Sequence, residues 1–135
     1  MSAKKLHTDA APSAIGPYSQ AMVINGMVYT SGQLPLTTEG QFAGDDIETQ
    51  THQIMKNIQA ILNAAGSSLD HVVKTMCFIA DMNEFATFNK IYEQYFNQSM
   101  PARSCVEVAR LPKDARIEIE VIAFVSESAQ DPEFL

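Results

Sequence analysis

Apolar residues fall into short runs and longer periodic stretches along the chain, and the clearest short runs flank the dipeptide Asn25-Gly26. Asn-Gly favours a two-residue type I′ turn, because that turn needs positive φ at both central positions. The sequence therefore predicts a β-hairpin of residues 21–24 and 27–30. Continued outward, the same register places Tyr18 beside Ser31, on one side of the sheet.

Two longer stretches repeat apolar residues at intervals of three and four, which is the period of an amphipathic helix. The first runs from Ile47 to Ala65. Asp45 and Glu48 at its start resemble a capping box, and Gly66 suits the position just past its end. The second follows capping residues 81–83 and carries an aromatic-rich stripe of Phe85, Phe88, Ile91, Tyr92, Tyr95 and Phe96.

The remaining apolar runs predict further strands. Residues 72–80 form a strand with apolar side chains on both faces. Residues 104–109 and 116–125 predict a second antiparallel pair, turned around Leu111-Pro112-Lys113-Asp114. Residues 1–17 are polar, small and interrupted by prolines, and we interpret them as a lead-in segment.

The order of these elements indicates an α+β fold with one mixed sheet and both helices on one face. The last strand is apolar on both sides, with Ile122 and Phe124 alternating with Val121 and Ala123. Because a second copy is the only partner that the sequence supplies, we expect a homo-oligomer whose sheets face inward. We assign residues 1–125 to a single domain and residues 126–135 to an acidic C-terminal tail.

Composition and charge narrow the class of protein. The 135 residues are 46% hydrophobic and 19% charged, which are values of a globular domain. The net charge of −7 repels phosphate backbones and anionic lipid, so nucleic acid is a poor partner. Cys77 and Cys105 stand in apolar runs typical of reduced thiols, and no stretch reaches the roughly 20 apolar residues of a membrane span. We expect a cytoplasmic protein.

Metal and cofactor motifs are not found in the sequence. The histidines are isolated from one another and share no ligand spacing with a cysteine: His7, His52 and His71. No glycine-rich phosphate loop follows a predicted strand. We therefore expect neither a metal nor a cofactor.

Charged residues inside the last two predicted strands are the candidates for chemistry. Arg103 shares a strand face with Cys105 and Glu107, while Glu118 and Glu120 share a face of the next strand. One interpretation is a solvated arginine in a cross-strand ion pair worth at most about 1 kcal/mol. The other is a guanidinium that binds a ligand carboxylate, worth roughly 1.5–3 kcal/mol, with a carboxylate of the neighbouring strand as proton acceptor. The pattern leaves both open.

Four stretches of the sequence resemble the RidA (YjgF) family of enamine and imine deaminases: AIGPYSQ at 14–20, TSGQ at 30–33, FATFN at 85–89 and PARSCVEVARLPKD at 101–114. The resemblance runs in order from about residue 8 to 125, and its last run is highly specific. It implies a chorismate-mutase-like fold and a homotrimer with clefts between subunits. It also implies hydrolysis of 2-aminoacrylate, 2-iminopropionate and related imino acids to 2-oxo acids and ammonia, without a cofactor.

The resemblance also implies roles for individual residues. Arg103 would hold the substrate carboxylate, with backbone groups around Gly32 and Cys105 completing the cradle. Glu118 would position or deprotonate the attacking water, and three further side chains would shape and polarise the cleft: Tyr18, Ser31 and Asn89. Because Arg103, Cys105 and Glu118 are all present, the chain is similar to the deaminase-active members.

Alternative interpretations remain at this stage. Glu118 can be a structural carboxylate, and Tyr18 an aromatic residue of an interface. The Cys105 thiol has no base beside it in the sequence, so its backbone is the better candidate for a contact. The protein as a whole can be a non-catalytic carboxylate-binding sensor, a holdase chaperone or an endoribonuclease. The net charge of −7 and the lack of a histidine pair argue against the endoribonuclease.

Overall fold

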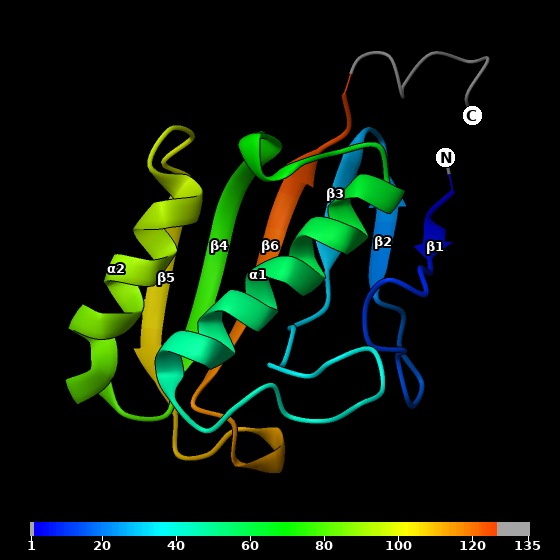
Figure 1. Ribbon diagram of the computed structural model, residues 1–135. Coiled ribbons are helices and arrows are strands. Elements are labelled where there is room, and N and C mark those ends of the chain that lie inside the picture. The colour runs from blue at the N-terminus through cyan, green and yellow to red at the C-terminus, as the bar shows by residue number, and fades with distance from the viewer. Residues whose placement is uncertain (1, 127–135) are drawn as a thin grey trace.

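The computed structural model describes residues 2–126, which form a six-stranded mixed sheet with the order β1-β2-β3-β6-β4-β5. Two long helices cover the same face of this sheet (Figure 1). The expected α+β fold, with one mixed sheet and both helices on one face, is confirmed. The elements are β1 Lys4–Leu6, β2 Ala21–Ile24, β3 Met27–Thr30, α1 Ile47–Ala64, β4 Val72–Ile79, α2 Phe85–Phe96, β5 Ala102–Glu107 and β6 Ile117–Phe124.

The hairpin of β2 and β3 turns at the predicted dipeptide. Asn25 has φ 53° and Gly26 has φ 76°, so both central residues adopt the positive φ that a type I′ turn requires. Met22 pairs with Tyr29 across the two strands. The predicted hairpin is confirmed.

The N-terminal segment contains a strand that its polar composition did not indicate. β1 pairs antiparallel with β2 and places Lys5 opposite Met22. Gln20 is only 2% exposed. Its Nε2 donates to the carbonyl oxygens of Thr8 at 3.0 Å and Pro12 at 2.8 Å, and its Oε1 accepts from the Thr8 N–H at 2.7 Å. This buried amide ties the segment to the sheet, because unpaired polar groups are costly there.

Helix α1 begins one residue later than the capping pattern predicts. Its N-cap is Asp46, whose Oδ2 accepts a hydrogen bond from the Thr49 N–H at 2.8 Å. Asp45 with Glu48 and Asp46 with Thr49 have the same spacing, so the sequence alone does not separate them. The end of the helix agrees with the prediction, because Gly66 follows the C-cap with φ 78°.

The core lies between the helices and the sheet. The residues of β6 that face the helices are at most 2% exposed: Ile117, Ile119, Val121 and Ala123. From α2, Phe88, Tyr92 and Phe96 pack in a row with ring centroids 5.7 and 4.7 Å apart. The predicted apolar stripe of this helix therefore forms one wall of the core.

The predicted antiparallel pair of the last two strands is wrong. β5 pairs in parallel with β4, and β6 pairs antiparallel with both β3 and β4. The chain leaves β5, passes the end of β4 and returns on its other side as β6 (Figure 1). β6 has a continuous buried face, and a central position between two strands buries that face more fully than an edge position would.

The sheet face away from the helices exposes large apolar side chains. Tyr29 and Val106 are each 44% exposed, and Phe124 is 38% exposed. Ile122 lies between Tyr29 and β4 on the same face and is half-buried. Large apolar side chains exposed together on one sheet face are typical of interaction surfaces. Its burial in a homotrimer stays a prediction.

Among residues 2–126, no helix has both the length and the apolar character needed to cross a bilayer. Of the predicted tail, Ser126 is described, and its N–H donates to the Gly66 carbonyl at 3.0 Å. Positions 127–135 lie outside the described residues. The division into a domain of residues 1–125 and a tail stays a prediction.

Candidate functional site

Arg103 and Asn89, two of the predicted site residues, lie together at the β5 edge of the sheet. Nη1 of Arg103 donates to Oδ1 of Asn89 at 2.6 Å. Its Cζ lies 4.6 Å from the ring centroid of Tyr92 and 5.4 Å from that of Phe85. Such cation–π contacts contribute about 0.5–1 kcal/mol at exposed sites. Side chains of α2 therefore hold a guanidinium that is exposed.

Phe85 and Tyr92 are neighbours of the candidate site that the sequence analysis assigned only to the apolar stripe. They lie four residues before and three residues after Asn89, so the three side chains share one face of the helix. A polar residue with one aromatic residue four positions before it and another three positions after it is the sequence signal that could have indicated a cation-binding surface on this helix.

Cys105 lies on the same strand face as Arg103 and pairs in register with Cys77 of β4. Both cysteines are free thiols. Burial raises the pKa of Cys105, although the Arg103 charge opposes it, and burial raises the pKa of Cys77 to about 12. A thiol with a raised pKa is protonated at neutral pH and is a poor nucleophile. This favours a backbone contact, and not a thiol reaction, for Cys105.

Glu118 lies on the opposite face of the sheet and packs against Gly32. A Cβ at residue 32 would overlap Oε2 of Glu118 and lie only 2.9 Å from its Cδ. Glycine therefore allows this close approach. Burial raises the pKa of the Glu118 carboxyl, and the negative charge of Glu120 raises it further. A carboxylate with a raised pKa is a stronger base, which suits proton transfer.

Tyr18 lies near Gly32, and both residues line a cavity of about 50 Å³. The ring is exposed and available for contact. Ser31 donates its N–H to the Gln20 carbonyl at 2.9 Å and its hydroxyl to the Ser19 carbonyl at 2.6 Å. The pairing of the hairpin therefore continues one residue beyond β2 and β3, to Gln20 and Ser31, and the position of Tyr18 beside Ser31 stays a prediction. The segments that carry Tyr18, Ser31, Gly32 and Glu118 form a second group, away from the β5 edge.

Arg103 and Glu118 do not meet within one chain. Arg103 pairs with Thr75 across β5 and β4, and Thr75 pairs with buried Val121 on the face covered by the helices. Glu118 pairs with Phe78, which lies on the other face. The expectation that the neighbouring strand supplies a carboxylate beside Arg103 is therefore wrong, because β4 separates the two strands and the side chains point to opposite faces.

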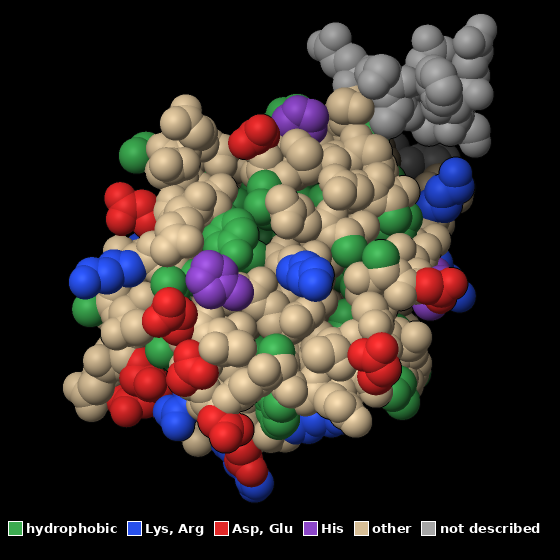
Figure 2. Space-filling view, in the orientation of Figure 1, with side chains coloured by type: hydrophobic (Ala, Val, Ile, Leu, Met, Phe, Trp, Pro, Cys, Tyr) green, Lys and Arg blue, Asp and Glu red, His purple; other side chains and the backbone are tan. Residues whose placement is uncertain are grey.

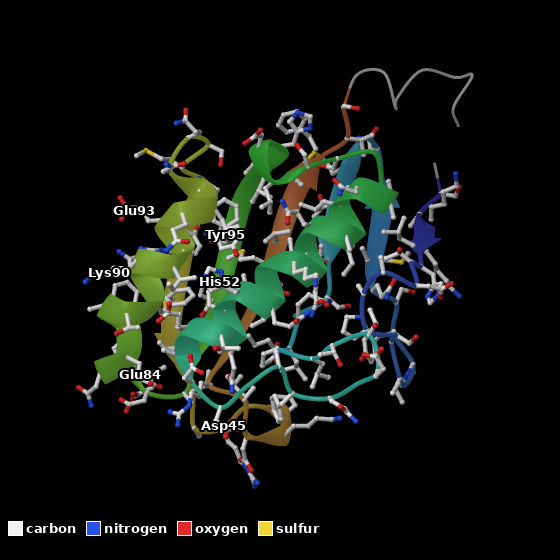
Figure 3. All side chains as sticks on the ribbon, in the orientation of Figure 1. Asp45, His52, Glu84, Lys90, Glu93 and Tyr95 are labelled. Carbon is white, nitrogen blue, oxygen red and sulfur yellow. The ribbon has the colours of Figure 1, made fainter. Side chains whose placement is uncertain are left out.

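Some polar groups elsewhere on the helix face have local partners. His52 of α1 and Tyr95 of α2 approach each other between the helices, with Nδ1 2.5 Å from the hydroxyl oxygen (Figure 3). Arg116 binds Glu84 at 3.1 Å and the backbone carbonyl of Asp45. Acidic and basic side chains are interspersed on this face (Figure 2). Within residues 2–126, no three His, Cys, Asp or Glu side chains gather as a metal site.

A small α+β domain with these two groups of residues has clear counterparts among known proteins. The family model described as "Endoribonuclease L-PSP" matches residues 8–125. The chain therefore belongs to this family, which is the RidA (YjgF) family, and the resemblance found in the sequence is confirmed.

Relatives in this family carry different names. A Salmonella typhimurium protein named 2-iminobutanoate/2-iminopropanoate deaminase is 49% identical over 123 residues, which are 89% of this chain and 96% of the relative. A Lactococcus lactis protein named "Putative regulator AldR" is 54% identical over 123 residues, 90% of this chain and 98% of the relative.

A solved structure shows the same fold with a small molecule. The crystal structure of E. coli TdcF with bound serine has a TM-score of 0.85 and 45% sequence identity. The match covers 91% of this chain and 99% of that chain. The fold is therefore that of the family, and one of its members binds a molecule with a carboxylate.

Proposed function

We propose that the protein hydrolyses 2-aminoacrylate, 2-iminopropanoate and related imino acids to 2-oxo acids and ammonia. The observation that carries this proposal is the seated guanidinium of Arg103. Its Nη1 is bound to Asn89, and within residues 2–126 its other N–H donors have no hydrogen-bond partner. A planar guanidinium with free donors suits a carboxylate, which these substrates carry. The names of relatives near 49% identity support the same activity.

The proposed site is completed by a second copy of the chain. Arg103 and Glu118 lie on opposite faces of one sheet, so a substrate bound to one cannot reach the other within a protomer. The exposed apolar face beside Glu118 supports association of copies through that face. The assembly is a homotrimer, in which Arg103, Asn89 and Cys105 of one protomer meet Tyr18, Ser31, Gly32 and Glu118 of the next.

Imine hydrolysis requires the protein only to bind the substrate, position a water molecule and transfer protons. The substrate carboxylate binds Arg103, with N–H groups near Gly32 and Cys105 as further donors. 2-Aminoacrylate takes a proton at C3 and becomes the iminium form of 2-iminopropanoate. Glu118 accepts a proton from water as the oxygen attacks the C=N carbon of this iminium, which gives a carbinolamine. Glu118 returns this proton to the nitrogen, and ammonia leaves as the hydroxyl proton is released and the C=O bond forms. Proton transfer by a positioned group contributes roughly 10²–10⁴-fold, and Tyr18, Ser31 and Asn89 orient the reactants.

A coupled assay tests the proposal. A serine dehydratase generates 2-aminoacrylate, and release of pyruvate is followed with and without the protein. Wild type is expected to accelerate release, while Arg103→Ala and Glu118→Gln are expected to lose most of the acceleration. Arg110→Ala is the matched control, because Arg110 is an exposed arginine that pairs with the exposed Asp114 at 2.6 Å. A wild type that adds nothing to the unassisted rate would refute the proposal.

The name of the Lactococcus relative supports a second candidate, a non-catalytic sensor of small carboxylates. The same assay separates it from the enzyme. A sensor would bind 2-oxobutanoate through Arg103 but would not accelerate pyruvate release, and Glu118→Gln would leave its affinity unchanged.

A further inference from the structure

The Tyr92 ring beneath the Arg103 guanidinium is itself fixed by a hydrogen bond. Thr75 and Arg103 are register partners on adjacent strands, so their side chains leave the sheet side by side on one face. The Thr75 hydroxyl lies 2.8 Å from the Tyr92 hydroxyl. The Tyr92 ring spans from this bond to the guanidinium, whose Cζ lies 4.6 Å from the ring centroid. The Tyr92 ring of α2 thus contacts a side chain of β4 and a side chain of β5.

The surroundings leave Tyr92 little freedom. The residue is only 7% exposed, and its ring packs between Phe88 and Phe96 at centroid distances of 5.7 and 4.7 Å. Thr75 is fully buried at 0% exposure. Burial raises the pKa of the Tyr92 hydroxyl, so the phenol keeps its proton at neutral pH and the bond to Thr75 persists. An exposed arginine normally samples many rotamers, whereas this one lies against a rigid platform.

We propose that Tyr92, held by Thr75, is the positioning residue that orients the Arg103 guanidinium before substrate binds. The inference rests on the proposed function, because Arg103 is the residue that we propose binds the substrate carboxylate. Asn89 fixes one end of the guanidinium and the Tyr92 ring fixes its plane, so binding does not have to order the side chain. The ring and hydroxyl of Tyr92 act through Arg103 and do not touch substrate.

Conservative variants isolate the hydrogen bond. Tyr92→Phe and Thr75→Val each remove one hydroxyl and keep the ring, so each is expected to weaken the contact only in part, raising KM about 2-fold with kcat unchanged. The double variant is expected to match the single variants, because both remove the same bond. Tyr92→Leu removes the ring and with it the contact of about 0.5–1 kcal/mol, so it is expected to raise KM about 2- to 5-fold. Tyr95→Phe is the matched control, since its hydroxyl bonds His52 and not the Arg103 platform.

An NMR measurement reads the orientation without substrate. The Arg103 Nε–H signal is expected to show an upfield ring-current shift in wild type and Tyr95→Phe, a smaller shift in Tyr92→Phe and Thr75→Val, and the smallest shift in Tyr92→Leu, in which only the Phe85 ring still lies near the guanidinium. A purely structural role of Tyr92 would lower the unfolding temperature while leaving this signal and KM in place, which would overturn the inference. An unshifted signal in wild type would overturn it as well.

The two readouts separate this inference from the proposed function. If wild type shows the shifted Arg103 signal but accelerates no imine hydrolysis, the deaminase proposal fails. In that case the orientation is tested on 2-oxobutanoate binding, whose dissociation constant must rise in Tyr92→Phe and Thr75→Val by about the factor given for KM. Equal dissociation constants in wild type and both variants would refute the positioning role.

Discussion

Replacing Gly32 by alanine tests the placement of the Glu118 carboxylate without changing any reacting group. The new Cβ would lie 2.9 Å from Cδ of Glu118, about half an ångström inside the 3.4 Å at which ordinary contacts begin, and would overlap Oε2. The carboxylate is the end of a flexible side chain, so it moves aside while the backbone stays. Gly32 does not have the positive φ that would strain alanine.

We expect Gly32→Ala to lower kcat. A misplacement of about 1 Å can lower a rate on the order of 10²-fold, and Oε2, which overlaps the new Cβ most closely, must move at least that far, so Gly32→Ala is expected to lower kcat about 100-fold. KM is expected to change less than about 3-fold, because the alanine keeps the backbone N–H groups near residue 32 and leaves Arg103 of the neighbouring protomer unchanged. The coupled pyruvate assay gives both constants, and thermal unfolding shows whether the fold is kept.

Gly44→Ala is the matched control for this variant. Its Cβ would lie 2.8 Å from Cγ2 of Thr49, which is a comparable overlap with the end of a side chain near the start of α1. It is expected to lower stability slightly and leave kcat unchanged. Equal kcat values in wild type, Gly32→Ala and Gly44→Ala would refute the claim that the position of Glu118 matters for the reaction.

Three further predictions use the same assay or the mass of the assembly. Arg103→Lys keeps the charge but loses the planar fork, so KM is expected to rise roughly 10- to 160-fold, and an unchanged KM would contradict bidentate binding. Glu120→Gln removes a negative charge that raises the pKa of Glu118, so the acidic limb of kcat/KM is expected to move to lower pH. Because the raised pKa costs stability once pH exceeds it, Glu120→Gln is also expected to be more stable at neutral pH, and a less stable variant would contradict this sign. Ile122→Asp places a charge on the apolar open face and is expected to convert trimers to monomers in native mass spectrometry, and a trimeric variant would exclude that face as the interface.

The parts of the fold that the sequence predicted correctly are those fixed by local conformation. Asn25-Gly26 sets the register of the first hairpin because a type I′ turn admits few other residues, and Gly66 ends α1 for a similar reason. The start of α1 was displaced by one residue, since Asp45 and Asp46 offer the same spacing. Each of these features depends on residues only a few positions apart.

The parts that the sequence did not predict depend on contacts between distant segments. A short connection between β5 and β6 suggested a hairpin, but the insertion of β6 between β3 and β4 is decided by burial of the whole sheet. Because β6 does not lie beside β5, the expected contact between Arg103 and Glu118 does not form within one chain either. The seat of Arg103 on Tyr92 was also missed, because the rings of α2 had an adequate explanation as core residues.

The most direct test of the composite site is subunit mixing. Arg103→Ala and Glu118→Gln are each expected to be nearly inactive, and they are combined in equal amounts under conditions that exchange subunits. If each site takes Arg103 from one protomer and Glu118 from another, random mixing restores about a quarter of the sites, and activity rises to about that fraction of wild type. If both residues act within one chain, every site of the mixture lacks one of them, the mixture stays as inactive as its components, and the account is wrong.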